Sequence, residues 1–427
     1  MKVLVVGGGG REHALAWGLA RSPSVDEVIA APGNPGIASV ARCIPVEPND
    51  VDAVAALADD LSADLVVVGP EEPLVRGAVD AIQARGRAAF GPSAQGARLE
   101  GSKRWMKELV EGAGVPTALH ASFDASNERD AFEFLDTLDG LYVVKTDGLA
   151  AGKGVVVTES LDEAREAVRA YLSGDAFGDA GRTLVIEEGL RGPELSLLVL
   201  CNGDPDAAVP LAPAQDFKRI HDGDTGPNTG GMGAYSPVPI AGAEMVDQVM
   251  ATAVLPTLDA LATEGIAYRG VLYAGIMLTA DGPKVLEYNV RFGDPECQVV
   301  VPRLATDLGE LCLASARGDA LPTVRFVDDA CVTVVLATEG YPAAPRKGDP
   351  IAGIEAAEEL PGVTVFHAGT DRDADGTIVT AGGRVLAVTG VGPTITDARA
   401  AAYAGAQRIN WPGMQYRSDI AAHAAST

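Results

Sequence analysis

Three short apolar runs near the start of the chain each end in a turn rich in glycine or proline. The runs cover residues 2–6, 28–30 and 65–68, and the turns cover residues 7–10, 32–36 and 69–73. Apolar residues at helical spacing follow the first turn. A repeated order of strand, turn and helix is typical of a parallel, doubly wound α/β sheet. We therefore expect such a domain over residues 1–101.

The rest of the chain lacks this repeated order of strand, turn and helix and predicts two further domains. A helix is expected at 103–111, followed by strands at 142–145, 155–158, 184–188, 270–279 and 284–288. These elements predict an α+β central domain over 102–323, in which residues 117–190 form a subdomain. Strands at 331–337 and 384–389 and a helix at 395–409 predict a small α+β domain over 324–427. The polar, glycine-rich stretch 217–235 is expected to be a functional loop.

Charge and composition restrict the partners of the chain. A net charge of -26 over 427 residues repels nucleic acid and anionic membranes, so a phosphate ligand requires locally concentrated basic side chains and backbone N–H groups. Neither a leader nor a long uncharged apolar window is seen, which predicts a cytoplasmic protein. An odd number of cysteines without a Cys-x-x-Cys pair predicts reduced, buried thiols at Cys43, Cys201, Cys297, Cys312 and Cys331.

The first glycine cluster does not match the dinucleotide fingerprint. Glu12 or His13 stands where the third glycine should be, and no acidic residue follows the strand that ends near Ala31. Backbone N–H groups at the mouth of a helix still attract anions, and Arg11 adds a charged contact. The turn at Gly9 is therefore interpreted either as a phosphate site or as a tight strand-to-helix turn.

A second glycine cluster, at residues 148–154, is one residue shorter than a Walker loop. Gly154 stands where that loop needs Ser or Thr for magnesium. Apolar strands flank the cluster on both sides, which favours a hairpin lid over phosphates, with Gly152 in its loop and charge supplied by Lys145 and Lys153. The alternative is an ordinary hairpin with exposed lysines.

The richest local chemistry lies at residues 287–296. Glu287 and Asn289 are two apart on one strand, so their oxygen ligands share a face, and hard oxygen ligands favour magnesium over zinc. Arg291 offers a planar fork for phosphate, and Asp294 and Glu296 follow a glycine bend. The alternative is a surface turn with scattered charges.

Two further segments are candidate walls of the same site. Asp216 and Lys218 precede the glycine-rich stretch and are expected opposite the metal residues. An acidic segment follows a predicted strand, where backbone groups could hold an adenine and a carboxylate could hold a ribose diol. The alternative is a solvated acidic cluster. The nucleotide residues of this segment are Glu187, Glu188, Leu190 and Glu194.

These motifs resemble the ATP-grasp ligases, and within them the glycinamide ribonucleotide synthetase family. The resemblance is carried by residues 7–14, 69–74, 147–155, 222–235 and 291–296 and covers nearly the whole chain. It implies that the central domain has the ATP-grasp fold. It also implies that ATP phosphorylates the carboxylate of glycine, and that the amine of 5-phosphoribosylamine attacks the acyl phosphate, an early step of purine synthesis.

The resemblance also assigns roles to individual residues. Metal ligation of Mg²⁺ or Mn²⁺ falls to Glu287 and Asn289, and neutralisation of the transferred phosphate falls to Arg291 and Lys218. The other roles are glycine placement by Asp294, further substrate contacts by Asp216, phosphoribosylamine binding by Gly9, Arg11 and Glu71, and ATP contacts by Lys103, Lys145, Gly152, Lys153, Gly154 and residues 187–194. Two positions depart from the family pattern, Phe217 in place of His and Thr146 in place of Ala.

Two other functions share these features. One is a different ATP-grasp ligase that activates bicarbonate or another acid, and the other is a nonenzymatic sensor that binds ATP without turnover. The turn at Arg11 and the loop at Glu71 suit a phosphoribosyl amine, and the intact set of Glu287, Asn289 and Arg291 argues against a sensor. The expected partners are small molecules only, with no nucleic acid and no membrane, and a monomer is expected.

Overall fold

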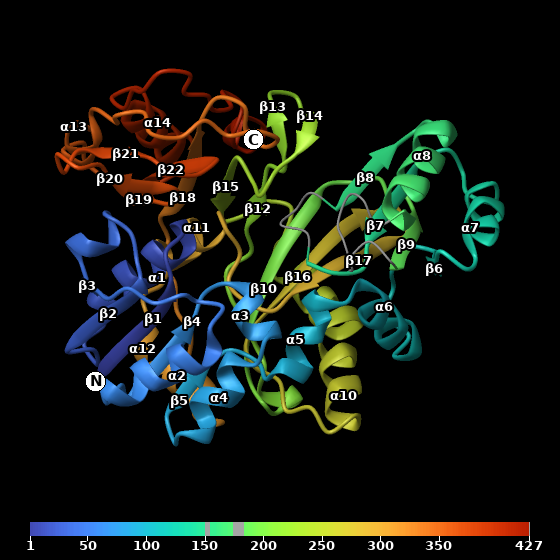
Figure 1. The fold of residues 1–427 in the computed structure, drawn as a ribbon, viewed down its shortest axis with the longest axis horizontal. Coiled ribbons are helices and arrows are strands. Elements are labelled where there is room, and N and C mark those ends of the chain that lie inside the picture. Colours follow the sequence, from blue (N-terminus) through green and yellow to red (C-terminus); the bar gives the residue numbers. More distant parts are fainter. Residues whose placement is uncertain (150–153, 174–182, 427) are drawn as a thin grey trace.

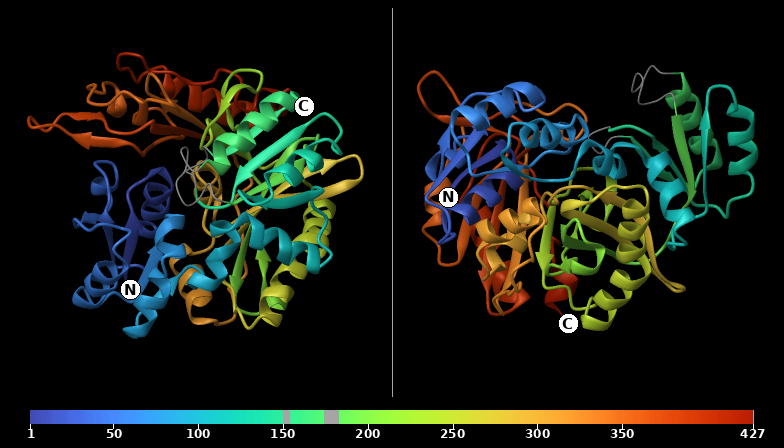
Figure 2. Two further views of the ribbon diagram at one scale, coloured as in Figure 1. Left: turned by 45° about the vertical axis from the view of Figure 1, so that its right-hand side comes forward. Right: turned by 90° about the horizontal axis from the view of Figure 1, so that it is seen from below.

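The computed structural model describes residues 1–149, 154–173 and 183–426. Figure 1 shows a first domain beside a C-terminal one, a central part next to both, and a lid of strands and helices at the far side. Figure 2 shows from below that the lid stands away from the first domain. No helix among the described residues is long and apolar enough to cross a membrane.

The first domain is built on a parallel sheet of five strands in the order β3-β2-β1-β4-β5. All four strand pairs are parallel, which confirms the predicted doubly wound sheet. Its elements are β1 (Lys2–Gly7), α1 (Gly10–Ala20), β2 (Glu27–Pro32), β3 (Arg42–Cys43), α2 (Val51–Asp60), β4 (Leu65–Val68), α3 (Glu71–Val75), α4 (Ala78–Ala84), β5 (Ala88–Phe90) and α5 (Ala94–Gly101).

The two faces of this sheet are covered by helices from different parts of the chain. Side chains alternate along a strand, so Val3 and Val5 of β1 face one side while Leu4 and Val6 face the other. Leu4 and Val6 belong to a core with residues of α2 and α4. Val3 and Val5 belong to a second core with residues of α1 and of α12 (Leu308–Arg317), which lies beyond the central part of the sequence. Burial on both faces explains why these strands are apolar throughout.

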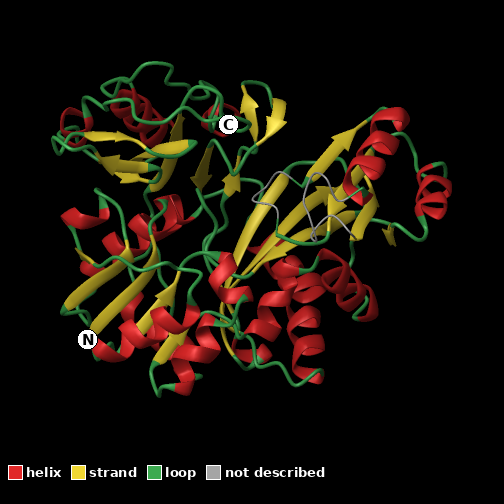
Figure 3. Cartoon of the chain, in the orientation of Figure 1, coloured by secondary structure: helices red, strands yellow, loops and turns green. Residues whose placement is uncertain are grey.

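The central part is an antiparallel sheet in the order β11-β10-β16-β17 with helices against it. The long strands β16 and β17 pair as the predicted hairpin, and Figure 3 shows them running toward the middle of the molecule. The elements are α6 (Lys103–Gly112), β10 (Glu194–Asn202), β11 (Val209–Pro210), α9 (Ala243–Val249), a π-helical turn (Met250–Val254), α10 (Leu255–Thr263), β16 (Arg269–Thr279), β17 (Gly282–Asn289) and α11 (Cys297–Val300).

The lid is a separate antiparallel sheet in the order β6-β9-β7-β8. Its own small core joins α7 and α8 to the sheet through residues such as Ala131, Val144 and Val168. The predicted hairpin of two apolar strands is confirmed as the antiparallel pair of β7 and β8. The lid comprises β6 (His120–Asp124), α7 (Glu128–Leu135), β7 (Tyr142–Thr146), β8 (Val155–Thr158), α8 (Leu161–Leu172) and β9 (Thr183–Glu188).

The C-terminal sheet has the order β12-β15-β18-β22-β19 and corrects one prediction. The stretch 217–235, expected to be a loop, contains the hairpin of β13 and β14 and the start of β15, which pairs with β18. These strands were not predicted, because they are short and their sequence is polar and contains glycines. The elements are β12 (Gln215–Asp216), β13 (Arg219–His221), β14 (Thr225–Asn228), β15 (Gly233–Ser236), β18 (Ala330–Ala337), α13 (Ile354–Glu358), β19 (Val363–His367), β20 (Thr370–Arg372), β21 (Ile378–Thr380), β22 (Arg384–Gly392), α14 (Ile395–Ala406) and α15 (Ala422–Ala425).

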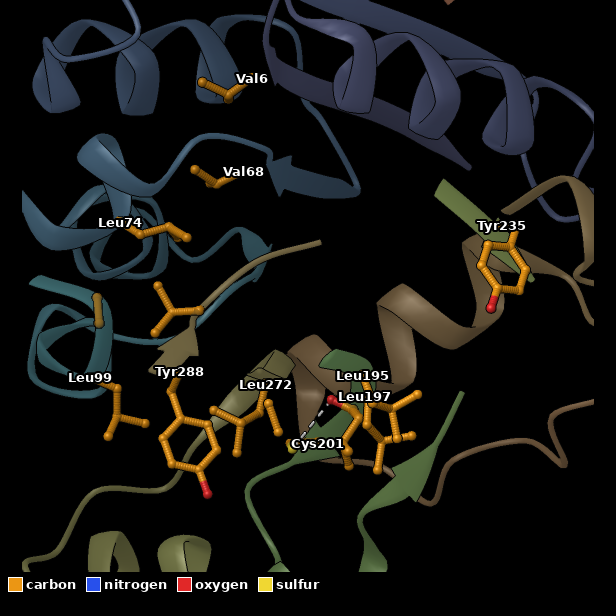
Figure 4. Packing of buried hydrophobic residues seen from close by; sticks show 14 of the residues in the cluster. Val6, Val68, Leu74, Leu99, Leu195, Leu197, Cys201, Tyr235, Leu272 and Tyr288 are labelled. Atoms are coloured by element: carbon orange, nitrogen blue, oxygen red, sulfur yellow. Dashed lines mark hydrogen bonds between the residues drawn. The ribbon is translucent and has the colours of Figure 1, made fainter. Parts of the chain in front are cut away.

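The largest core passes under the centre of the molecule. Figure 4 shows part of it, where Leu195, Leu197 and Leu272 of the central sheet lie near Tyr288 of β17. Tyr288 is fully buried, which fixes the face of β17 that carries its neighbours Glu287 and Asn289. The core therefore positions the predicted metal residues on the opposite face.

Candidate active site

Two adjoining cavities lie between the lid, the central sheet and the other two domains. The larger has a volume of about 600 Å³ and the smaller about 330 Å³. The two cavities share part of their walls, so a ligand in one can reach a ligand in the other. The shared residues are Val155, Asp216, Lys218, Thr229 and Glu287.

The predicted metal residues lie together at the end of β17. Glu287 and Asn289, two apart on this strand, both line the smaller cavity. Glu287 lies opposite Gly275 of β16, whose missing side chain leaves room for the carboxylate. Burial opposes ionisation of Glu287, but the ammonium groups of Lys218, Lys145 and Lys103 outweigh it and lower its pKa. Glu287 is therefore ionised at neutral pH.

This pair of ligands fits a divalent ion that is bound together with phosphates. No cluster of three or more His, Cys, Asp or Glu able to hold a metal occurs among the described residues. Mg²⁺ commonly uses one or two carboxylates and takes its other ligands from water and substrate phosphates. One ionised carboxylate and one amide oxygen beside several ammonium groups have the chemistry of such a shared site.

Arg291 is held between two carboxylates. Its NH2 group donates to Oε1 of Glu100 at 2.7 Å, and its Nε lies 3.4 Å from Oε2 of Glu71. Burial works against ionisation of Glu71, yet the guanidinium groups of Arg291 and Arg11 lower its pKa to about 2. These partners hold the Arg291 side chain on the wall of the smaller cavity.

The turn at Gly9 joins β1 to α1 and is closed by a side chain of that helix. The Gly9 N–H donates to Oε2 of Glu12 at 2.6 Å, and Oε1 of Glu12 accepts from Nε of Arg11 at 2.7 Å. Glu12, which occupies the third glycine position, therefore caps its own helix. The Gly9 N–H is not available to a phosphate in this conformation. Arg11, also 3.6 Å from Glu71, is the residue of this turn that reaches the smaller cavity.

Asp294 is held by residues on two sides. Its Oδ1 accepts from Nε2 of Gln298 at 2.6 Å, and its Oδ2 accepts from NH2 of Arg384 at 2.9 Å. Burial disfavours the charged carboxylate, but the guanidinium groups of Arg384 and Arg11 lower its pKa. Arg384 also donates to the backbone carbonyls of Gly230 and Asp294. An arginine of the C-terminal sheet thus orients a carboxylate of the central part.

A lysine of the lid and a lysine of α6 meet at Glu187. Oε1 of Glu187 lies 2.8 Å from Nζ of Lys145, and its Oε2 accepts from Nζ of Lys107 at 2.9 Å. All three side chains are buried. Lys145 also donates to the carbonyl of Leu286, the unpaired residue at the irregular point of β17. Glu187 therefore positions lysines, and its carboxylate is not free to hold a ribose.

Lys218 lines both cavities together with Glu287. Its Nζ donates to both carboxylate oxygens of Asp216 at 3.0 Å and lies 3.0 Å from Oε2 of Glu194. Burial raises the pKa of Asp216 despite this ammonium group. Lys218 faces both cavities and stands at their junction.

The remaining described residues that were predicted to bind the nucleotide each line one of the two cavities. Glu188, Leu190 and Glu194 line the larger cavity, and Gly154 and Lys103 line the smaller cavity. Lys103 donates from Nζ to the carbonyl of Gly148 at 3.2 Å. The predicted contacts of Gly152 and Lys153 lie outside the described residues.

Several site residues were not predicted from the sequence. Glu100, Tyr273 and Arg384 line the smaller cavity, and Lys107 pairs with Glu187, which lines the larger one. Glu100 lies just before Ser102-Lys103, at the predicted boundary between two domains. Its position at that boundary was a sequence signal from which it could have been predicted. Arg384 carries no local signal, because 90 residues separate it from Asp294.

Charge is concentrated here although the whole chain is acidic. Among the described residues, the smaller cavity is lined by five cationic side chains, namely Arg11, Lys103, Lys218, Arg291 and Arg384. Six carboxylates line it as well, and every one of these cations except Lys103 forms an ion pair with one of them. Such an arrangement suits a ligand that brings both phosphates and a divalent ion.

The three parts of the chain match three models of one protein family. Residues 1–100 match the N domain of phosphoribosylglycinamide synthetase, residues 101–297 match its ATP-grasp (A) domain, and residues 331–423 match its C domain. Together these matches cover most of the chain.

Individual relatives agree over the whole length. A phosphoribosylamine–glycine ligase of Streptomyces coelicolor is 49% identical over 100% of both chains. The crystal structure of the phosphoribosylamine–glycine ligase of Thermotoga maritima has a TM-score of 0.83 and 35% identity, covering 98% of this chain and 100% of that one. The biotin carboxylase domain of Hydrogenobacter thermophilus 2-oxoglutarate carboxylase, 18% identical with a TM-score of 0.73 over 97% and 91% of the two chains, shares the fold alone.

Proposed function

The chain belongs to the phosphoribosylglycinamide synthetase family, and we propose that it ligates glycine to 5-phosphoribosylamine at the junction of its two cavities. The reaction consumes ATP and gives glycinamide ribonucleotide, ADP and phosphate in purine biosynthesis. The relatives at nearly half identity carry the name of this ligase over their full length.

One observation carries the assignment to the site. Lys218 and Glu287 line both cavities, so a cation for phosphate and a carboxylate for a divalent ion meet where the cavities join. Phosphoryl transfer needs positioning and charge neutralisation rather than a protein nucleophile. Residues at the junction can both position the reacting groups and neutralise their charge.

The larger cavity is the proposed place of ATP. Backbone groups near Leu190 contact the adenine in this proposal, and Glu188 and Glu194 stand along the rest of the nucleoside. Lys145 and Lys103 donate to phosphate oxygens. Lys145 is pre-oriented by Glu187 and by the carbonyl of Leu286, so it needs little rearrangement when the nucleotide enters.

Glu287 and Asn289 would hold Mg²⁺ or Mn²⁺ between the protein and the phosphates. When bound, the ion neutralises charge on the phosphate oxygens. The lowered pKa of Glu287 keeps the carboxylate ionised for this role. Arg291 and Lys218 supply further positive charge where the transferred phosphoryl group develops charge.

The smaller cavity is the proposed place of glycine and 5-phosphoribosylamine. Asp294, ionised beside Arg384, can bind the glycine ammonium group while the glycine carboxylate points to the junction. Arg11 and Glu71 face the phosphoribosyl group, with Arg11 rather than the Gly9 N–H supplying the anion contact. Asp216 completes the wall on the side of Lys218.

The reaction then proceeds in two transfers. A glycine carboxylate oxygen bonds to the terminal phosphorus of ATP as ADP leaves. The amine of phosphoribosylamine next bonds to the carbonyl carbon, phosphate leaves, and the nitrogen loses a proton. Enclosure by the lid protects the acyl phosphate from water between these transfers.

Product analysis tests the proposal. The protein is incubated with ATP, labelled glycine and freshly generated phosphoribosylamine, and products are identified by mass spectrometry. We expect the label in glycinamide ribonucleotide only when all three substrates are present. Turnover with bicarbonate in place of glycine would support the rival ligase, and ATP binding without any product would support a sensor.

A single substitution tests the role of the metal residues. Glu287→Gln removes the charge and keeps the shape, and it is expected to lower kcat by about 100-fold, the order of effect of removing one group that stabilises transition-state charge. Glu310→Gln, on the exposed first turn of α12, is the matched control and keeps wild-type turnover. Unchanged turnover of Glu287→Gln contradicts the assigned role.

A further inference from the structure

The end of the chain lies against the larger cavity. Figure 1 shows the C-terminus beside β13 and β14. Ala421, His423 and Ala424 line the cavity, as do Asp224 and Asn228 of the hairpin. The C-terminal segment 415–426 and this hairpin therefore form one continuous rim of the proposed ATP site.

Arg417 joins the two parts of this rim. Its side chain is 1% exposed, and its Nε and NH2 groups donate to the two carboxylate oxygens of Asp419 at 2.7 Å each. Its NH1 group donates to Oδ1 of Asp224 at 2.6 Å and to the carbonyl of Arg219 at 3.1 Å. A guanidinium that donates to two carboxylates and a carbonyl holds these partners in a defined geometry.

A second set of contacts holds the turn of the hairpin to the same segment. Oδ2 of Asp419 accepts from the Gly223 N–H at 2.8 Å. Oδ1 of Asp222 accepts from the Ser418 N–H at 2.8 Å, and the Ser418 hydroxyl donates to Oδ2 of Asp222. The turn between β13 and β14 is thus fixed from the C-terminal side.

Arg417 also packs against Phe217, one of the two residues expected to depart from the family pattern. Its Cζ atom lies 5.0 Å from the centre of the Phe217 ring, within the range of a cation–π contact. The Phe217 ring also lies near that of Tyr235, at 6.2 Å between ring centres. Phe217 immediately precedes Lys218, and all three residues Phe217, Lys218 and Tyr235 line the larger cavity.

We propose that Arg417 is a positioning residue for the nucleotide site. Through Asp224, Arg219 and the Phe217 ring it holds the wall that carries Lys218, so the C-terminal segment belongs to the ATP-binding apparatus. The proposal rests on ATP occupying the larger cavity. It requires Arg417 to affect nucleotide affinity without contacting the nucleotide.

Calorimetric titration with MgADP tests this directly, because it needs no ligase turnover. Arg417→Met is expected to raise the Kd for ADP about tenfold, which corresponds to about 1.4 kcal/mol. In steady-state assays the KM for ATP rises by a similar factor while the KM for glycine changes less than twofold. Arg417→Lys keeps the positive charge near Phe217 but cannot form the bidentate hydrogen bonds of a guanidinium. Its affinity for ADP is therefore expected to lie between those of Arg417→Met and the wild-type protein.

Controls separate positioning from a general loss of structure. Arg303→Met removes another buried guanidinium, which binds Ser236 and backbone carbonyls away from both cavities, and it should leave the Kd for ADP unchanged. If Arg417→Met does not fold, Asp224→Ala, whose side chain is 66% exposed, takes its place and is expected to raise the Kd severalfold.

The outcomes also distinguish this proposal from the proposed function. A wild-type Kd in Arg417→Met, or in Asp224→Ala where that variant replaces it, overturns the role of Arg417. If the wild-type protein binds ADP but forms no glycinamide ribonucleotide, the proposed reaction fails while the titration still decides the role of Arg417. If wild-type protein binds no ADP, the nucleotide site and the role of Arg417 fail together.

Discussion

The NH2 group of Arg384 lies 2.9 Å from Oδ2 of Asp294, and the two residues are 90 positions apart. Arg384 begins strand β22 of the C-terminal sheet, whereas Asp294 follows the last strand of the central sheet. The ion pair therefore couples the placement of a proposed glycine-binding carboxylate to the docking of another domain.

Arg384→Met is expected to raise the KM for glycine about tenfold, because Asp294 loses one of the two groups that orient it and misplacement of a binding group is costly. The KM for ATP should change less than threefold. Steady-state kinetics with each substrate varied in turn measure both values. Arg372→Met, an exposed arginine of β20, is the control, and an unchanged KM for glycine in Arg384→Met contradicts the prediction.

Arg291→Met is expected to lower the free energy of unfolding by about 3 kcal/mol, because it leaves the buried carboxylate of Glu100 without its cation. Glu100→Gln in the same protein removes that charge, so the double variant should be more stable than the sum of the single effects predicts. Urea unfolding of the four proteins measures this coupling. Strict additivity would show that the Arg291–Glu100 pair contributes nothing specific.

Two buried tyrosines allow a comparison of hydrogen-bond strength. The Tyr273 hydroxyl donates to the Glu296 carboxylate at 2.6 Å, whereas the Tyr288 hydroxyl donates to the neutral carbonyl of Ala253 at 3.0 Å. Tyr273→Phe is expected to cost about 2 kcal/mol of unfolding free energy and Tyr288→Phe about 1 kcal/mol, since bonds to charged groups are stronger. Urea unfolding checks both, and equal or reversed costs contradict the reasoning.

Two buried histidines at the contact of the first and last domains predict acid sensitivity. Nδ1 of His13 accepts from the His367 N–H at 2.7 Å. Burial, together with the neighbouring His367, lowers the pKa of His13 to about 3, and burial lowers that of His367 to about 4. The unfolded chain binds a proton on His13 near pH 6.5, so the stability contributed by the neutral ring is complete above that pH and is lost as the pH falls toward 3.

His13→Gln isolates this contribution, because an amide oxygen can still accept the His367 N–H. Between pH 7 and pH 5 the wild-type protein is expected to lose about 2 kcal/mol more unfolding free energy than the variant. Most carboxylates titrate below this window, and their contribution is common to both proteins. Identical pH dependence of the two urea midpoints would show that His13 is not neutral in the folded state.

The sequence predicted the elements that local patterns define. The strand starting at Lys2, the helix starting at Lys103 and the hairpin ending at Asn289 appear within a few residues of their expected bounds. Their apolar spacing and turn residues act over short distances along the chain. The strands within 217–235 were missed because they are short and polar. Among the described strands, β13 and β14 pair only with each other, and β15 is held by pairing with the distant strand β18.

The chemistry of the site divides in the same way. The sequence by itself placed Glu287 and Asn289 on one face of a strand and Arg291 just beyond it, because side chains alternate along a strand. Only the tertiary structure decided that Glu187 holds lysines, that Glu12 takes the Gly9 N–H, that Arg384 reaches the site from the C-terminal domain, and that Arg417 binds Asp224 at the rim of the larger cavity. Local spacing fixes which side chains share a face, whereas burial and charge pairing across domains depend on contacts between residues far apart in the chain.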